Sequence, residues 1–202
     1  PSFFQLGAST GRFSCGSPNV QQIPHGKEFR QCFRPVNEDN CFVISDYGQI
    51  ELRILAHLSK DKNMCRAYRE SIDLHSMTAK GAYNLDCEIS EVATKYKEYR
   101  NLAKGLNFGV VYGIGAQRYA DSVGITFEQA ASAIQGFYNT YTGAEKWLRA
   151  MEQEGVRNRY VRTLAGRKIK FYFDSNDNKA VSLTKRNSRN APIQGLSADI
   201  LK

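Results

Sequence analysis

The chain has 202 residues, of which 42% are hydrophobic and 24% charged, and this ordinary composition fits one or two globular domains with a sizeable core. Its net charge is +8, and no apolar run approaches the ~18 residues of a membrane-spanning helix, so no membrane partner is expected. The five cysteines are odd in number and form no CxxC pair, which argues against a disulfide framework or a zinc site and favours a reducing compartment.

The first half of the chain changes from looped to helical sequence. Residues 1–35 are rich in Gly, Ser, Pro and Asn and predict extended or looped structure. The apolar run at 41–46 predicts a short buried strand that ends on Asp46, and 49–59 then take up helical spacing. A further helix is expected within 64–83. Another is expected from an N-cap at Ser90 to Tyr112, where Gly113 and Gly115 follow.

The second half predicts more helix and one pair of strands. Thr126 and Gln129 form a capping-box pattern, which predicts a helix from about 127 to 141. Helical spacing resumes at 144–156, and 160–173 predict two short strands around Ala165-Gly166. A surface loop at 175–178 precedes a basic segment and a last helix. Because strands and helices do not alternate, the fold class expected is α+β, mainly helical, and not a doubly wound sheet.

The positive charge is concentrated in one stretch. From Arg157 to Arg189 there are ten Lys or Arg against two Asp, a net +8, so the rest of the chain is close to neutral. This stretch favours a polyanionic partner, nucleic acid before membrane, although a merely solvated basic face gives the same composition. The chain starts at Pro1 and stops at Lys202 inside a predicted helix, so it is expected to be a piece of a longer protein.

Four residues spaced four apart form a row within RNLAKGLNFGVVYG: Arg100, Lys104, Phe108 and Tyr112. Side chains at this spacing lie on one face of a helix. The row therefore offers two cations for a phosphate tail at one end, then two aromatic rings for a sugar and a base. This order suits a nucleoside triphosphate, while an ordinary amphipathic helix also mixes these residue types.

Asp46 stands at the end of the predicted strand and just before a predicted helix. A carboxylate held there with its oxygens facing a cleft suits a hard cation such as Mg²⁺. A single Asp at a strand end is more often a turn or cap residue, so the neighbouring sequence has to decide between the two.

Five segments in order resemble family A DNA polymerases, the DNA polymerase I type. DYGQIELRILAHLS from Asp46 to Ser59 and RNLAKGLNFGVVYG from Arg100 to Gly113 are similar to the A and B motifs of that family. Three further stretches agree: TGRFSCGSPNVQQIP (10–24), YVRTLAGRK (160–168) and NAPIQG (190–195). Together they run nearly from end to end, so the resemblance is specific.

The resemblance implies a right-hand polymerase architecture, of which this chain would hold part of the palm and the fingers. Residues 1–60 would be a palm portion with motif A. Residues 61–156 would be the fingers, including a dNTP-binding helix at 100–113. Residues 157–202 would form a basic segment that returns to the palm, while the thumb and the end of the palm are missing. The expected function is template-directed DNA synthesis, by nucleotidyl transfer from a dNTP to a primer 3′-hydroxyl.

The resemblance also implies roles for individual residues. Asp46 would bind both catalytic Mg²⁺ ions, helped by the backbone carbonyl of Tyr47, and would be catalytic together with Arg100, Lys104 and Tyr112. The residues expected to contact the incoming dNTP are Arg100, Lys104 and His75 at the triphosphate, Phe108 at the sugar, Tyr112 beside the templating position, Glu51 with Tyr112 as a gate against a ribose 2′-hydroxyl, and Gln49 close by.

Primer-template DNA is the second expected partner. The residues implied to contact it near the primer terminus are Arg12, Asn19, Gln21, Gln22, Asn190 and Gln194. The family needs a second carboxylate in a His-Asp-Glu turn, and this sequence contains no such triplet, so that metal ligand would lie outside the chain. A monomer is expected, located in the cytoplasm of a bacterium, in that of a host cell if the source is viral, or in an organelle.

Two other functions remain open at this stage. A single-subunit RNA polymerase has a related fold, but Glu51 as a ribose gate and the Asn107-Phe108 pair argue against it. A non-catalytic module that binds DNA or nucleotide would use the basic stretch alone. It would have no use for Asp46 or for the row on the predicted helix.

Overall fold

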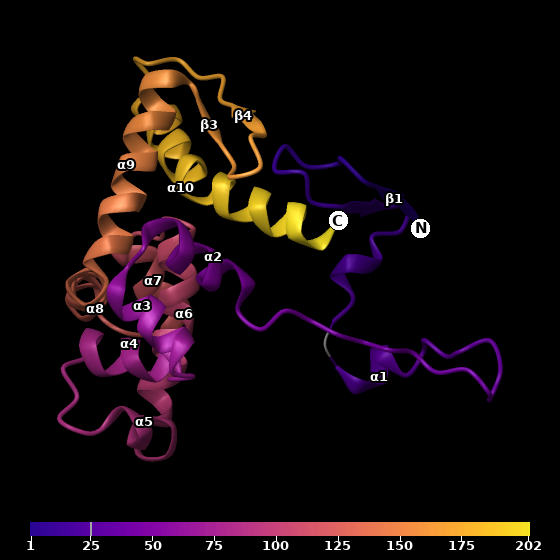
Figure 1. Ribbon diagram of the computed structural model, residues 1–202, viewed down its shortest axis with the longest axis horizontal. Coiled ribbons are helices and arrows are strands. Elements are labelled where there is room, and N and C mark those ends of the chain that lie inside the picture. The colour runs from indigo at the N-terminus through magenta and orange to yellow at the C-terminus, as the bar shows by residue number, and fades with distance from the viewer. Residues whose placement is uncertain (25) are drawn as a thin grey trace.

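The computed structural model describes residues 1–24 and 26–202 of the chain (Figure 1). A body of packed helices, α2 to α9, occupies one side of the molecule, and the last helix, α10, extends from it. The first fifty residues run along the other side, where the N- and C-termini lie near one another (Figure 1).

The N-terminal segment contains little regular structure, as its composition predicts. Strand β1 (Ser2–Phe4) pairs antiparallel with β2 (Ser14–Gly16), and Phe3 stands opposite Cys15. A single 3-10 turn (Val20–Gln22) and the short α1 (Lys27–Arg30) follow. From 31 to 49 the chain has neither helix nor strand.

The predicted strand at 41–46 is therefore wrong. These residues are extended but unpaired, and their apolar side chains face solvent: Val43 is 90% exposed and Ile44 81%. A strand requires a neighbour to satisfy its N–H and C=O groups. Within 1–24 and 26–202, both sheets consist of two strands, and neither contains this segment. Asp46 consequently lies on an exposed segment and not at the edge of a sheet.

The helix predicted at 49–59 is confirmed as α2 (Ile50–Ser59), whereas the next two predicted helices are each divided in two. The segment 64–83 forms α3 (Lys62–Arg69) and α4 (Leu74–Ala82), because Asp73 accepts the backbone N–H of Ser76 and starts a new helix. The segment 90–112 forms α5 (Ile89–Lys95) and α6 (Lys97–Val111), which meet at Tyr96. Helix α5 starts from a capping box of Glu88 with Glu91, so Ser90 is not its N-cap.

The second half follows the sequence pattern more closely. The capping box of Thr126 with Gln129 is confirmed at the start of α8 (Phe127–Thr140), and α9 (Thr142–Asn158) follows. Strands β3 (Tyr160–Arg162) and β4 (Lys168–Lys170) pair antiparallel, with Gly166 at φ +87° in the turn between them. Helix α10 (Asn178–Leu201) ends the chain. One short helix, α7 (Ala116–Val123), was not predicted. No helix in the described parts of the chain is long and apolar enough to cross a membrane.

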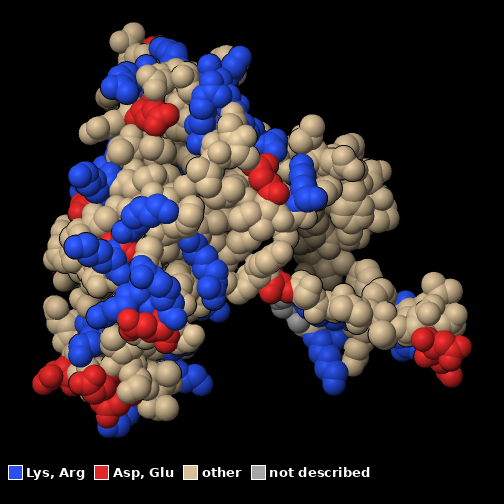
Figure 2. All heavy atoms as spheres, viewed as in Figure 1, with Lys and Arg blue, Asp and Glu red and all other residues tan. Residues whose placement is uncertain are grey.

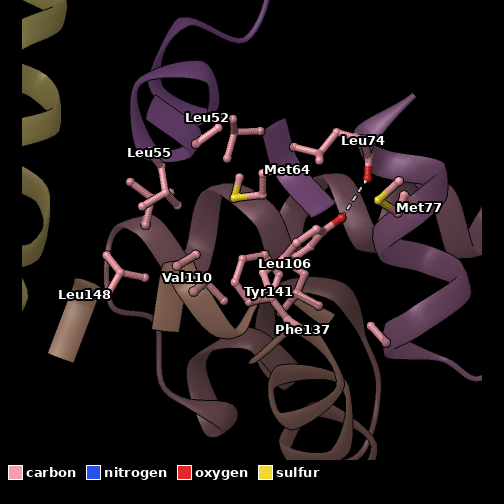
Figure 3. Close-up of a cluster of buried hydrophobic side chains, with 14 of the residues drawn as sticks. Leu52, Leu55, Met64, Leu74, Met77, Leu106, Val110, Phe137, Tyr141 and Leu148 are labelled. Atoms are coloured by element: carbon pink, nitrogen blue, oxygen red, sulfur yellow. Dashed lines mark hydrogen bonds between the residues drawn. The ribbon is translucent and has the colours of Figure 1, made fainter. Parts of the chain in front are cut away.

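The main core lies where α2, α4, α6 and α8 meet (Figure 3). Its large, fully buried side chains come from these four helices and from α3 and α9: Leu52, Leu55, Met64, Leu74, Leu106, Val110, Phe137, Tyr141 and Leu148. Each contributes roughly 1.5–3 kcal/mol by leaving water. The rings of Phe137 and Tyr141 meet edge to face, with centroids 4.9 Å apart. Leu106 and Val110 fix the inner face of α6, so the opposite face of that helix is directed outward.

A buried carboxylate joins α3 to α9. Asp61, which is 3% exposed, accepts the N–H of Met64 at 2.9 Å and that of Gly143 at 2.8 Å, and the N–H of Ala144 lies 3.3 Å away. It therefore satisfies otherwise unpaired N–H groups at the start of two helices, where the helix dipoles also favour negative charge.

We expect Asp61→Asn to lower the free energy of unfolding by about 1–3 kcal/mol, because the amide nitrogen cannot accept the hydrogen bonds that one carboxylate oxygen now receives. Urea unfolding followed by circular dichroism measures this change. Asp86→Asn, at an exposed acid, is the matched control and should stay within about 0.5 kcal/mol of the wild type. Equal stability of the two variants would show that Asp61 does not stabilise the starts of α3 and α9.

Candidate nucleotide and nucleic-acid site

The predicted row lies on one face of α6. Arg100, Lys104 and Phe108 belong to the helix, and Tyr112 is its C-cap residue, 42% exposed. Gly113 follows at φ +69°, a conformation that glycine adopts without strain and that ends the helix. Lys104 is exposed and Arg100 and Phe108 are half-buried. The row is thus accessible along its whole length.

Arg100 is paired with an acid that the sequence did not single out. Its Nε lies 2.7 Å from Oδ2 of Asp73 and its Nη2 lies 3.2 Å from Oδ1, a two-point contact across the α4–α6 boundary. Burial disfavours the charged carboxylate, but the hydrogen bonds from Arg100 and Ser76 outweigh it, so the pKa of Asp73 lies below its usual value. The signal in the sequence was the N-cap position of Asp73 in DLHS.

His75 lies beside the row, in the first turn of α4. It is 3% exposed, and its ring centroid is 6.1 Å from that of Phe108. Its Nδ1 is 2.8 Å from Nδ2 of Asn107. Burial lowers the pKa of His75, Asp73 opposes this, and the positive charges of Arg100 and Lys104 lower it further. His75 is therefore a neutral imidazole at neutral pH, beside the two cations of the row.

Glu51 and Tyr112, which are far apart in the sequence, meet at the other end of the row. The Tyr112 hydroxyl is 3.1 Å and 3.0 Å from the two carboxylate oxygens of Glu51, and Arg12 forms an ion pair with the same carboxylate. Gln194 of α10 lies beside the Tyr112 hydroxyl and lowers the pKa of Tyr112, but its effect is smaller than those of burial and Glu51. Burial, followed by the charge of Glu51, raises the pKa of Tyr112, so its hydroxyl stays a donor at neutral pH.

Asp46 and Tyr47 lie just before α2, on the segment that has neither helix nor strand. Both are exposed, Tyr47 at 55%, and no hydrogen bond or ion pair joins Asp46 to another described residue. Gln49 is the N-cap of α2 and accepts a hydrogen bond from the Tyr68 hydroxyl at 3.1 Å. No group of three or more His, Cys, Asp or Glu suited to a metal ion occurs among residues 1–24 and 26–202.

The predicted DNA-contacting residues fall into two further places. Asn19 caps the 3-10 turn that carries Gln21 and Gln22, which are exposed. Asn190 and Gln194 lie on α10 and line a cavity of about 480 Å³ bounded by the N-terminal loop and the end of β4. The Oδ1 of Asn190 is buried and has no hydrogen-bond partner among the described residues.

Basic side chains cluster on the β3–β4 hairpin and its surroundings. Figure 2 shows Lys and Arg over the upper end of the molecule, where β3, β4 and the end of α9 lie in Figure 1. Aromatic rings support several of them: Lys168 Nζ is 3.7 Å from the centroid of Tyr160, and Arg159 stacks on Phe173 at 4.7 Å. Such pairs hold cations in place while leaving their charge available to an anion.

Arg189 was missed by sequence reasoning because nothing in its basic surroundings distinguishes it. Its side chain, 11% exposed, contacts three other helices. Nη1 is 3.0 Å from Oε1 of Glu152 on α9, and Nη2 lies 3.0 Å from the Val110 carbonyl at the end of α6 and 2.7 Å from the Tyr138 hydroxyl on α8. Arg189 thus ties α10 to the turn of α6 that precedes Tyr112.

Comparison with known proteins identifies the family. The sequence profile of DNA polymerase family A matches residues 1–202. The chain belongs to DNA polymerase family A. DNA polymerase I of Treponema pallidum is 37% identical over 206 residues, and that of Synechocystis sp. is 38% identical over 225 residues. These alignments cover 100% and 99% of this chain but only 20% and 22% of the two relatives, so this family A chain spans about a fifth of their length.

A solved structure is similar over the same range. It is the POL domain of Pol1 from M. smegmatis in complex with DNA primer-template and dNTP. The TM-score is 0.82 at 32% sequence identity, and the match covers 98% of this chain and 35% of that one. This family A chain is therefore a mainly helical α+β part of a polymerase domain.

We expect Arg189→Met to lower the free energy of unfolding by about 2–3 kcal/mol, because it leaves the half-buried Glu152 unpaired and removes a donor from the Val110 carbonyl. Arg149→Met is the matched control. Arg149 also pairs with a Glu, at 2.7 Å, but its side chain is 65% exposed, so less than about 0.5 kcal/mol should be lost. Similar losses in urea unfolding would contradict a special role for Arg189.

Proposed function

We propose that the polypeptide containing this chain carries out template-directed DNA synthesis, transferring a nucleotide from a dNTP to a primer 3′-hydroxyl. One observation carries this proposal: Arg100, Lys104, Phe108 and Tyr112 lie along one face of α6. His75 of α4 lies beside its cationic end, and Glu51 of α2 accepts a hydrogen bond from Tyr112 at its aromatic end. Membership of DNA polymerase family A supports it.

The cationic end would bind the triphosphate. Arg100 would exchange Asp73 for phosphate oxygens. The side chains of Arg100 and Asp73 are each 31% exposed, so their ion pair contributes no more than about 1 kcal/mol to stability. Lys104 is exposed and needs no such exchange. Fixed cations at this position would offset the charge that develops on pyrophosphate as it leaves.

The aromatic end would hold the sugar and base. Phe108 would pack on the sugar, and Tyr112 would lie beside the templating position and move as the site closes. The Glu51 carboxylate, held by Arg12 and Tyr112, would stand where a ribose 2′-hydroxyl would lie and would exclude it. Gln49, one residue before α2, would lie close by.

Mg²⁺ is the expected cofactor. Asp46 and the carbonyl of Tyr47 supply hard oxygen donors of the type Mg²⁺ prefers, and they would hold the metal, whose role is to stabilise the attacking and leaving oxygens. These two donors do not complete an octahedral shell. A second carboxylate, outside this chain, would be needed.

Primer-template DNA would contact the surface that continues from this site. Arg12, Asn190 and Gln194 offer guanidinium and amide groups, which suit minor-groove acceptors that differ little between A·T and G·C. Asn19, Gln21 and Gln22 would extend these contacts. The cations of the β3–β4 hairpin would track phosphates without reading bases.

The division of the chain follows from this proposal. Residues 1–60 would belong to the palm and 61–156 to the fingers, and 157–202 would return to the palm of a right-hand polymerase. The thumb and the end of the palm would lie outside the chain. We propose a monomeric enzyme of the cytoplasm, or of an organelle, that acts on primer-template DNA and dNTPs.

Asp46→Ala in the parent polypeptide should abolish nucleotide incorporation and leave the affinity for primer-template unchanged, because Asp46 would bind metal and not DNA. Primer extension and fluorescence anisotropy measure the two quantities. Asp39→Ala, at another exposed acid of the same segment, is the control and should extend primers normally. If Asp46→Ala still synthesised DNA, Asp46 would not be a ligand of the catalytic metal.

Glu51→Ala should reduce the preference for dNTP over rNTP by about tenfold or more, because the side chain that would occupy the place of the 2′-hydroxyl is removed. The ratio of kcat/KM for the two substrates measures this. Glu51→Gln keeps the side chain's shape and isolates the effect of its charge. If the ratio were unchanged in Glu51→Ala, Glu51 would not be the residue that excludes the ribose 2′-hydroxyl.

A second candidate function is binding of DNA or nucleotide without catalysis. The lack of a three-ligand metal cluster among the described residues favours it for residues 1–202 taken alone. Binding to primer-template that tightens when the matching dNTP is added would support the polymerase. Binding that depends on salt and ignores nucleotide would support the simple module.

A further inference from the structure

A line of buried polar side chains crosses the core from α8 to His75. The Tyr141 hydroxyl is 2.8 Å from Oγ1 of Thr78, which is 2.9 Å from Oδ1 of Asn107. Nδ2 of the same amide is 2.8 Å from Nδ1 of His75. Tyr141, Thr78 and Asn107 are 0% exposed, so no water competes for these groups.

These four side chains admit two complete directions of hydrogen bonding. In the first, Tyr141 donates to Thr78, Thr78 donates to Asn107 Oδ1, and Asn107 Nδ2 donates to His75. In the reverse direction, Thr78 donates to the Leu74 carbonyl, 2.8 Å away. The Asn107 amide is then rotated by half a turn, so that its nitrogen faces Thr78 and its oxygen faces His75. His75 would then donate from Nδ1. The two directions leave the imidazole proton on opposite nitrogens.

Two observations favour the first direction. The amide of Asn107 is oriented with its oxygen toward Thr78 and its nitrogen toward His75. The Leu74 carbonyl also receives the backbone N–H of Thr78 within α4, so it does not need the Thr78 hydroxyl. In this direction Nδ1 of His75 accepts, and a neutral imidazole must carry its proton on Nε2.

The charges around His75 fit a neutral ring. Asp73 on α4 faces it together with Arg100 and Lys104 on α6, and burial and the two cations lower its pKa. A protonated Nδ1 would also direct its hydrogen at the NH₂ group of Asn107, which has no lone pair to accept it.

We propose that Asn107 is a positioning residue: oriented by Thr78 and Tyr141, it keeps the proton of His75 on Nε2, so that His75 offers a neutral N–H donor to the triphosphate of a bound nucleotide. The nucleotide part of this proposal rests on the proposed function. The tautomer part depends only on the buried hydrogen bonds, so the two can fail separately.

The first test is the tautomer of His75 in residues 1–202 labelled with ¹⁵N-histidine. The chain has three histidines, and His75→Gln assigns the signal. Long-range ¹H–¹⁵N correlation at neutral pH should show an unprotonated Nδ1 and a protonated Nε2. A protonated Nδ1, or rapid exchange between tautomers, would overturn the positioning role whatever the polymerase activity.

A matched pair of variants tests where the orientation originates. Thr78→Val removes the hydroxyl with little change of shape, so the Asn107 amide should turn over in part of the molecules and the Nδ1–H tautomer should appear. Thr78→Ser keeps the hydroxyl and should keep the wild-type tautomer. Identical spectra for the two variants would show that Thr78 does not orient Asn107. If Thr78→Val does not fold, the wild-type spectrum still decides the tautomer.

The nucleotide part is measured in the parent polypeptide. Thr78→Val should raise the KM for dNTP about tenfold or more, the size expected when a hydrogen bond to a charged group is lost, with a smaller change in kcat. Thr78→Ser should restore the KM. An altered tautomer with an unchanged KM would show that His75 does not donate to the triphosphate, and would leave the other nucleotide contacts of the proposed function unaffected.

Discussion

The buried hydrogen bonds that join Tyr141, Thr78, Asn107 and His75 determine how α6 is rotated about its axis. In a low-dielectric core an unpaired polar group costs about 1–3 kcal/mol, so Asn107 has to face Thr78 and His75. Apolar packing alone tolerates small rotations of a helix, whereas these bonds do not. With Asn107 fixed inward, Arg100, Lys104 and Phe108 are directed outward as one row.

Two sets of paired charged side chains lie at the ends of the row. Arg100 is held by Asp73, and Glu51 by Arg12 and Tyr112. The pairs differ in burial: the side chain of Glu51 is 9% exposed, whereas those of Arg100 and Asp73 are each 31% exposed. The cationic end can therefore exchange partners at low cost, while the acid at the aromatic end stays fixed.

Local pattern predicted helices well and their boundaries less well. The capping box of Thr126 with Gln129 predicted the start of α8, and the spacing of Arg100 to Tyr112 predicted one face of α6. Both patterns depend only on residues that are close together in the sequence. The sequence did not reveal that Asp73 divides one predicted helix in two. The strand expected at 41–46 was wrong, since strand formation depends on a partner elsewhere in the chain and not on the segment itself.

The sequence by itself determined the family and the face of α6 that carries the row, because these depend on residue type and short-range spacing. The roles of the individual site residues stay predictions. The family resemblance already implied that Glu51 acts with Tyr112, and the structure places their side chains in contact. Tertiary structure alone brought Asp73 to Arg100 and placed Arg189 against the end of α6. It also left Asp46 exposed, on a segment that belongs to neither of the two described sheets. Contacts between distant segments depend on how helices pack, which no local pattern encodes.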